Sequence, residues 1–232
     1  MAFDIDGTLY PERALSARLA SFAIRNARFL LAFSSARRKL HALDETSGDW
    51  PSDLAGFRRL QAELIAERLR LSEAEAAALA DRVIYAELDS YFAGVPVFAG
   101  LERALDDLAS GGLRLAVLSD FPTERKLKLL GLSGRFEVAQ CSESSGLLKP
   151  ASRPFLRLAE SLGLEPGEIL YVGNSRRYDM RGSLSVGMRA ALLSSARRRG
   201  DEADLVFSRW GDLASFALAS GARGRPAPVR PA

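Results

Sequence analysis

The chain has 232 residues, of which 47% are hydrophobic and 26% are charged, and its formal net charge is +3. This composition is typical of a folded protein with a sizeable core and argues against a largely disordered chain. The small net charge is spread along the sequence, so nucleic-acid binding, which needs a concentrated basic face, is not expected.

The first informative segment is the string Phe3–Tyr10, which follows a short apolar start. Met1–Ile5 predicts a β-strand, and Asp4 and Asp6, two residues apart, then project to the same side. Two neighbouring carboxylates repel each other unless one is protonated or a cation lies between them. Either state suits catalysis, with one carboxylate as nucleophile and the other exchanging a proton with the leaving group. A simple Asp–Gly turn is the structural alternative, and the specificity of the whole string favours catalysis.

Residues 11–98 predict helices and no convincing strand. Pro51–Asp53 starts a helix that ends near Leu71, and the capping box Ser72–Glu75 opens another that runs toward Phe92. We therefore expect residues 11–98 to form a helical cap inserted between the first and second strands of a sheet.

The beginning of this segment carries a basic stripe on one side of a predicted helix. Its members are Arg13, Arg18, Ser21, Arg25 and Arg28. Such a helix can lie on an anionic membrane surface, attract a phosphorylated substrate, or pack within the cap and leave its arginines in solvent. We favour packing, because apolar helix faces must be buried against something, and membrane contact is not expected. His41, the only histidine, is interpreted as a surface or packing residue without a role.

From residue 99 onward, short apolar runs alternate with amphipathic stretches. This alternation predicts a Rossmann-like, doubly wound parallel sheet covered on both faces, with residues 1–10 and 99–220 as the α/β core. The composition of residues 221–232 predicts a disordered tail. The expected strands are Leu113–Ser119, Phe136–Cys141, Ile169–Gly173, Arg189–Leu193 and Asp204–Phe207, and the expected helices are Leu101–Ser110, Thr123–Leu130, Ser152–Leu162, Asp179–Val186 and Gly211–Ala219.

Polar residues follow three of these runs. Ser119 ends one strand, Lys149 lies in the segment Gly146–Pro150, and the loop after Gly173 contains Asn174 and Asp179. Taken singly, a serine at a strand end or a lysine in a loop is a weak signal. Together with Phe3–Tyr10, however, these segments resemble the four motifs of the haloacid dehalogenase superfamily in the correct chain order, from Met1 to about Phe216.

The resemblance implies a phosphatase-type member of that superfamily, whose cap lies between the first and second motifs. Asp4 is then the nucleophile, Asp6 the general acid and base, Ser119 a hydrogen-bond donor to the transferring phosphate, and Lys149 the residue that neutralises its charge. The resemblance also implies Mg²⁺, held in oxygen-only coordination by Asp4, the main-chain carbonyl of Asp6 and the fourth motif, where Asn174 and Asp179 lie. The expected substrate is a small phosphorylated metabolite.

The fourth motif departs from the family pattern, which usually has an aspartate at the position of Asn174. An amide offers an oxygen to Mg²⁺ without the negative charge, so weaker magnesium binding is expected. Three functions therefore stay open: a small-molecule phosphatase, a catalytically weakened relative that binds a phosphorylated ligand or partner, and a phosphomutase. Asp6 favours the phosphatase over a dehalogenase, because a departing halide needs no acid.

Cellular location is predicted only indirectly. Cys141 is the single cysteine, so neither an internal disulfide nor a cysteine-based zinc site can form. Asp4 and Asp6 lie where a signal peptide would have its apolar core, and no apolar run approaches the roughly 20 residues that span a bilayer. We expect a cytoplasmic protein. The sequence indicates no particular oligomeric state.

Overall fold

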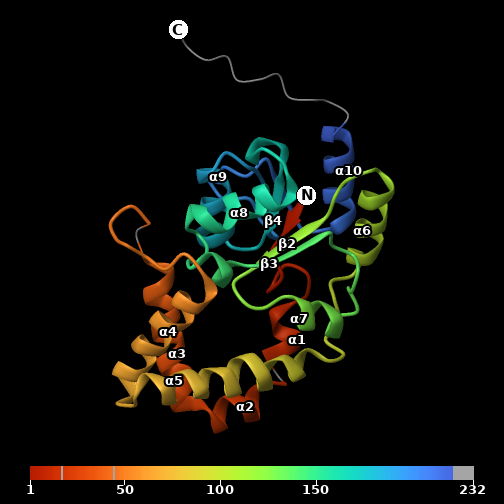
Figure 1. Cartoon of the computed structure of the whole chain (residues 1–232). Coiled ribbons are helices and arrows are strands. Elements are labelled where there is room, and N and C mark those ends of the chain that lie inside the picture. The colour runs from red at the N-terminus through yellow and green to blue at the C-terminus, as the bar shows by residue number, and fades with distance from the viewer. Residues whose placement is uncertain (17, 44, 222–232) are drawn as a thin grey trace.

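A computed structural model describes residues 1–221 except 17 and 44 (Figure 1). The predicted disordered tail therefore lies, apart from Gly221, outside the described residues. The fold prediction is confirmed: six parallel strands form one sheet in the order β3-β2-β1-β4-β5-β6. The strands are β1 (Ala2–Phe3), β2 (Ala116–Ser119), β3 (Val138–Cys141), β4 (Leu170–Gly173), β5 (Arg189–Leu193) and β6 (Leu205–Phe207).

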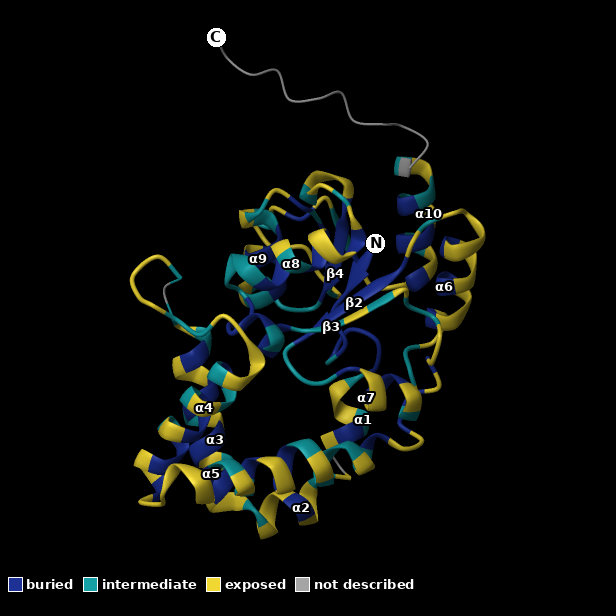
Figure 2. Cartoon of the chain, viewed as in Figure 1, coloured by how far each residue is buried: buried dark blue, intermediate teal, exposed yellow. Residues whose placement is uncertain are grey.

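Helices cover both faces of this sheet, as its continuous apolar strands predict. On one face, Phe3 and Val117 pack with residues of α6 and α10, while on the other, Ala2 and Leu118 pack with residues of α8. Figure 2 shows the central strands as buried. The helical elements of the core are α6 (Leu101–Ser110), α7 (Glu124–Leu129), η3 (Ser142–Ser145), α8 (Ser152–Leu162), η4 (Pro166–Glu168), η5 (Arg176–Met180), α9 (Arg181–Ser185) and α10 (Trp210–Gly221).

The described regular structure of residues 11–98, the predicted cap, is helical and lies beside the carboxyl edge of the sheet (Figure 1). Asp53 caps α4 by accepting a hydrogen bond from the Gly56 amide, and the predicted Ser72–Glu75 capping box is present. The elements are α1 (Glu12–Ser16), α2 (Ala20–Arg25), α3 (Ala27–His41), α4 (Leu54–Leu69), α5 (Glu73–Ala80), the π-helical η1 (Asp81–Glu87) and the 3-10 helix η2 (Leu88–Phe92).

The prediction that one helix carries the basic stripe is wrong, because its residues are distributed over α1, α2, α3 and the connections between them. Three of its arginines instead bind neighbouring parts of the cap. Arg18 donates to the carbonyls of Ala93 and Gly94, Arg25 pairs with Glu87, and Arg28 donates to the Leu69 carbonyl. These contacts agree with packing within the cap.

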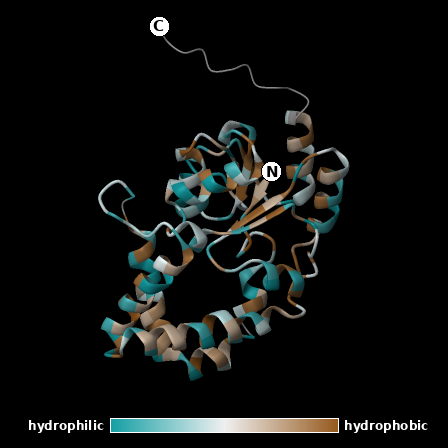
Figure 3. Cartoon of the chain, viewed as in Figure 1, coloured by the Kyte–Doolittle hydropathy of each residue, from teal (hydrophilic) through white to brown (hydrophobic). Residues whose placement is uncertain are grey.

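Apolar residues of α2, α3, α4, α5 and η1 form a cluster of their own. Leu15, Phe92 and Val95 belong instead to the core around the sheet, and Leu40 and Phe57 pack with Leu148. Figure 3 shows brown, hydrophobic segments along the strands and on parts of the cap helices. Among the described helices, none combines the length and apolar character required to cross a bilayer.

Candidate active site

The site lies at the carboxyl edge of the sheet, where β1 stands between β2 and β4. In this strand order the connections from β1 and β4 run to opposite sides and leave a ligand crevice at the strand ends. Asp4 follows β1 directly, and its amide donates to the Val172 carbonyl of β4 over 2.8 Å. The sheet ladder therefore fixes the backbone of the first motif.

Asp4 is a buried carboxylate with a donor on each oxygen. Lys149 Nζ lies 2.7 Å from Oδ1, and Thr8 Oγ1 donates to Oδ2 over 2.7 Å. Burial raises the pKa of Asp4 to about 7, a shift that Lys149 opposes and Asp179 reinforces. The carboxylate is thus held in one orientation in a site where its charge is only partly compensated.

Lys149 joins the first and fourth motifs. Its Nζ contacts Asp179 Oδ1 at 2.7 Å as well as Asp4, and it donates to the Tyr171 hydroxyl over 3.3 Å. Although burial lowers the pKa of Lys149, the two carboxylates raise it well above its ordinary value. Asp179 is held in place because its Oδ2 also accepts from the Ser175 amide at 2.9 Å.

Asp6 lies beside Asp4 and has a different cation. Lys126 Nζ, on α7, contacts Asp6 Oδ1 at 2.8 Å and Oδ2 at 2.7 Å. Tyr10 donates to Asp6 over 2.6 Å, and the predicted phosphate-binding residue Ser119 donates to Oδ2 over 3.2 Å. Burial alone raises the pKa of Asp6, but Lys126 and Tyr10 bring it below its ordinary value.

Gly7 brings the first and fourth motifs into close contact. Its φ of +79° is left-handed, and a Cβ added there would lie 2.1 Å from Asn174 Nδ2. Asn174 therefore packs against the backbone of the first motif. All six predicted site residues, Asp4, Asp6, Ser119, Lys149, Asn174 and Asp179, come together at this edge of the sheet.

The oxygen atoms at this edge of the sheet match only part of the ligand set that Mg²⁺ needs. Carboxylate, carboxamide and main-chain oxygens are the ligands that Mg²⁺ prefers. Within the described part of the chain, however, no three His, Cys, Asp or Glu side chains are grouped as metal ligands. A Mg²⁺ ion here would therefore combine Asp4 with the Asp6 carbonyl, the Asn174 amide and water, and with Asp179 directly or through water. Asp4 is buried beside two further carboxylates, and Lys149 compensates its charge only in part, which is the feature that fits such a cation.

A buried ion cluster fixes the cap to the core. Glu143, which has no exposed surface, accepts from Arg37 over 2.6 Å, Arg58 over 2.9 Å and Tyr85 over 3.0 Å, and all three donors belong to the cap. Arg37 also donates over 2.6 Å to the carbonyl of Asp120, the residue after Ser119. The position of the cap is thereby linked to the second motif.

His41 is a packing residue, as interpreted from the sequence, but its contact bears on the site. Its Nδ1 lies 2.6 Å from the Lys149 carbonyl, and its ring lies 4.5 Å from that of Tyr178. The end of α3 therefore supports the backbone of the third motif. Burial lowers the pKa of His41, which favours the neutral ring.

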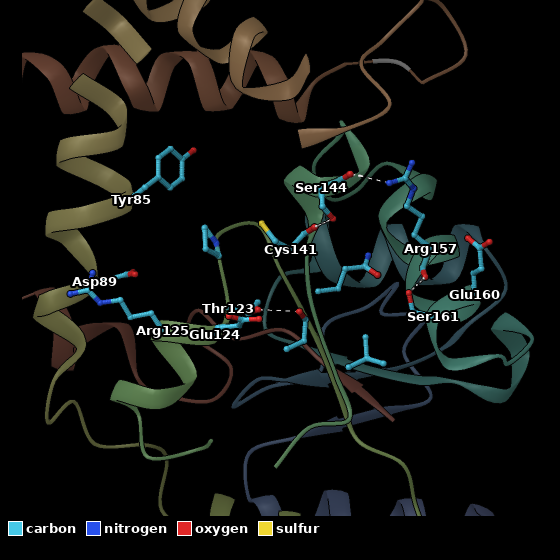
Figure 4. Close-up of a pocket in the computed structure, with 14 residues that line it drawn as sticks. Tyr85, Asp89, Thr123, Glu124, Arg125, Cys141, Ser144, Arg157, Glu160 and Ser161 are labelled. Carbon is cyan, nitrogen blue, oxygen red and sulfur yellow. Dashed lines mark hydrogen bonds between the residues drawn. The ribbon is translucent and has the colours of Figure 1, made fainter. Parts of the chain in front are cut away.

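Two cavities lie near this site. The larger, of about 880 Å³, is lined by α7, β3, α8 and the cap residues Tyr85 and Asp89 (Figure 4). None of the six site residues lines it, so it is unsuited to hold the reacting group. A second cavity of about 180 Å³ includes Asp6 and Lys126 in its wall. The two cavities share Tyr85, Asp89 and Pro122.

Sequence reasoning missed Lys126, Arg37 and Glu143. Lys126 and Arg37 lie on helices with neighbouring basic residues, where a cation usually faces solvent. Glu143 lies in a polar run, Ser142–Ser145, without a recognisable pattern. Thr8 belongs to the first motif, and only the structure reveals its bond to Asp4.

Comparisons with known proteins give one consistent family. The model for haloacid dehalogenase-like hydrolases matches residues 1–187. Glyceraldehyde 3-phosphate phosphatase of Methanopyrus kandleri is 29% identical over 93% of this chain and 91% of its own. Haloacid dehalogenase-like hydrolase domain-containing protein 3 of Mus musculus is 35% identical, but the match spans only 43% of this chain and 41% of the mouse protein. The crystal structure of 2-haloacid dehalogenase from Pseudomonas syringae superposes with a TM-score of 0.61 at 24% identity, covering 96% and 98% of the two chains, and thus supports the fold.

Proposed function

The chain belongs to the haloacid dehalogenase-like hydrolases, and on that premise we propose that it is a magnesium-dependent phosphatase that cleaves a small phosphomonoester through an aspartyl-phosphate on Asp4. The observation that carries the proposal is the pairing of buried Asp4 with Lys149, next to a second carboxylate at Asp6. Named relatives that hydrolyse phosphate esters support the same reaction class.

The first half-reaction transfers the phosphoryl group to the protein. The Asp4 carboxylate attacks phosphorus, and the bond between phosphorus and the leaving oxygen breaks. Asp6 gives a proton to that oxygen, a step that requires its protonated form although Lys126 favours the ionised one. Lys149 and Ser119 stabilise the charge on the transferring group. Thr8 and Lys149 hold the attacking carboxylate in place, which reduces the entropic cost of reaching an in-line geometry.

The second half-reaction releases phosphate. Asp6 removes a proton from water, the oxygen of that water attacks phosphorus, and the bond to Asp4 breaks. Asp4, the Asp6 carbonyl, Asn174 and Asp179 are the residues that would hold Mg²⁺, which would supply charge neutralisation when bound. Cap residues, among them Leu88 and Phe92, line part of the cavity beside Asp6.

Phosphate release from a panel of phosphomonoesters, measured with and without Mg²⁺, tests this function. Asp4→Asn is the control, because an amide is a poor nucleophile but nearly matches the carboxylate in size. The proposal predicts magnesium-dependent release that falls by roughly 10³-fold or more in Asp4→Asn. Equal release by the two proteins, or none by a folded wild-type protein at millimolar Mg²⁺, contradicts it.

Asn174 motivates a second candidate, a weakened relative that binds a phosphorylated ligand without turnover. Asn174→Asp separates the two candidates, because it restores a charged oxygen ligand in the fourth motif. For a phosphatase tuned to weak magnesium binding, the variant needs less Mg²⁺ for half-maximal activity. A variant that binds Mg²⁺ more tightly yet remains inactive favours the ligand-binding protein.

A further inference from the structure

The 180 Å³ cavity beside Asp6 has a mainly apolar wall. Its apolar residues come from α1, the following connection, η1, η2 and the loop after β2, and include Leu15, Leu19, Ile84, Leu88, Phe92 and Phe121. The Asp6 side chain is 31% exposed, whereas its partner Lys126 is 3% exposed. Asp6 is thus the accessible one of the pair, and the cavity borders the position where the leaving group departs.

The charged groups of this cavity do not favour an anion. Lys126 is the single cation among the described residues that line it, and both oxygens of Asp6 engage its ammonium group. Asp89 adds a further carboxylate to the wall. A carboxylate or second phosphate on the leaving group would therefore approach two acidic side chains and only one cation, which is already paired.

The hydroxyl groups of the wall are also engaged. Tyr10 donates to Asp6 over 2.6 Å. The Tyr85 hydroxyl donates to Glu143 over 3.0 Å and accepts from Gln61 over 2.9 Å. A sugar-like leaving group would lose its hydrogen bonds to water here and find few replacements, whereas an apolar group gains free energy in proportion to its buried area.

We propose that this cavity binds the leaving group of the substrate, and that this group is uncharged and apolar. The volume of the cavity also limits the size of the leaving group. A cavity of about 150 Å³ lined by Leu, Ile and Phe accommodates benzene. A short branched chain or a single ring fits a volume of about 180 Å³. The inference rests on the proposed phosphatase function and narrows its substrate class to small apolar phosphomonoesters.

Matched substrate pairs test this specificity. Propyl phosphate and glycerol 1-phosphate share a three-carbon chain, and ethyl phosphate and 2-phosphoglycolate share a two-carbon chain, so each pair differs mainly in polarity. We expect kcat/KM to be about tenfold or more higher for the apolar member of each pair. Equal values, or a preference for the polar member, overturn the inference.

Leu88→Asn places an amide in the cavity wall and should reduce the propyl-to-glycerol ratio of kcat/KM by about fivefold or more. This ratio is independent of the fraction of folded enzyme, so a loss of stability does not imitate the effect. Leu54→Asn is the matched control, because Leu54 is exposed at the start of α4 and does not line the cavity. An unchanged ratio in Leu88→Asn, or an equal reduction in both variants, contradicts the assignment.

Calorimetric binding of two non-hydrolysable probes, propylphosphonate and phosphonoacetate, separates this inference from the proposed function. Tighter binding of propylphosphonate by about tenfold supports the apolar cavity even if no ester is hydrolysed, in which case only the phosphatase proposal fails. Tighter binding of phosphonoacetate, or no binding of either probe, overturns the apolar cavity even if the protein hydrolyses other phosphate esters.

Discussion

Lys126 places its ammonium group between the two carboxylate oxygens of Asp6, at 2.8 and 2.7 Å. The general acid of the proposed reaction therefore has a buried cation as its partner. Removing Lys126 would raise the pKa of Asp6, because burial would then act with less opposition.

Lys126→Met should consequently shift the basic limb of the kcat/KM profile to higher pH. This limb falls where Asp6 loses the proton that it gives to the leaving oxygen, so a higher pKa retains activity at higher pH. The shift should be smaller with 4-nitrophenyl phosphate, whose leaving group needs little protonation. Lys128→Met on the exposed side of the same helix is the control. A basic limb that stays in place in Lys126→Met would mean that Asp6 is not the acid.

The raised pKa of Asp4 should make the stability of the protein depend on pH in the absence of Mg²⁺. Its pKa is about 7 in the folded protein and near 3.8 otherwise, so between these values the folded state binds more protons than the unfolded state. The free energy of unfolding should therefore fall as pH rises from about 4 to 7 through this group. Urea unfolding of wild type and Asp4→Asn at about pH 5 and pH 8 measures the contribution. If both proteins change equally between the two pH values, the raised pKa is refuted.

Glu143→Gln should loosen the attachment of the cap to the core. The variant leaves Arg37 and Arg58 without their buried carboxylate, and the loss of one partner from a buried ion cluster typically costs about 3–5 kcal/mol. Guanidinium unfolding gives the change in stability, and kcat/KM reports whether the cap position matters for turnover. Glu137→Gln, which removes an exposed carboxylate paired with Arg114, should change neither. Equal stability of the two variants would rule out a structural role for the cluster.

Gly7→Ala should destabilise the protein and abolish activity, because the new methyl group would lie 2.1 Å from Asn174 Nδ2 at a φ of +79°. Gly112→Ala separates the two causes, since Gly112 has a φ of +80° and open space around the added atom. The control should lose about 1 kcal/mol from backbone strain alone and keep its activity. Thermal unfolding and phosphate release measure both effects, and equal losses in the two variants would contradict a tight contact between the motifs.

The sequence predicted the parallel core well, because strands buried on both faces read as apolar runs and helices end at glycines. β5, α6 and α8 have the predicted bounds. The first strand is shorter than expected, and the basic cap helix is broken. Capping residues mark where α4 and α5 begin, but no residue pattern marked the breaks between α1, α2 and α3.

The residues of the candidate site were likewise predictable from local sequence. The end of each parallel strand meets the same edge, so motifs that follow strands must converge there, and Asp4, Lys149 and Asp179 do so. Only the tertiary structure shows which charged side chains pair with the carboxylates of the site and of the cap attachment. Lys126 is 120 residues from Asp6, and Arg37 is 106 residues from Glu143. Such contacts depend on how the cap and α7 pack, and a cation on a helix has the same appearance in sequence whether it faces solvent or a buried carboxylate.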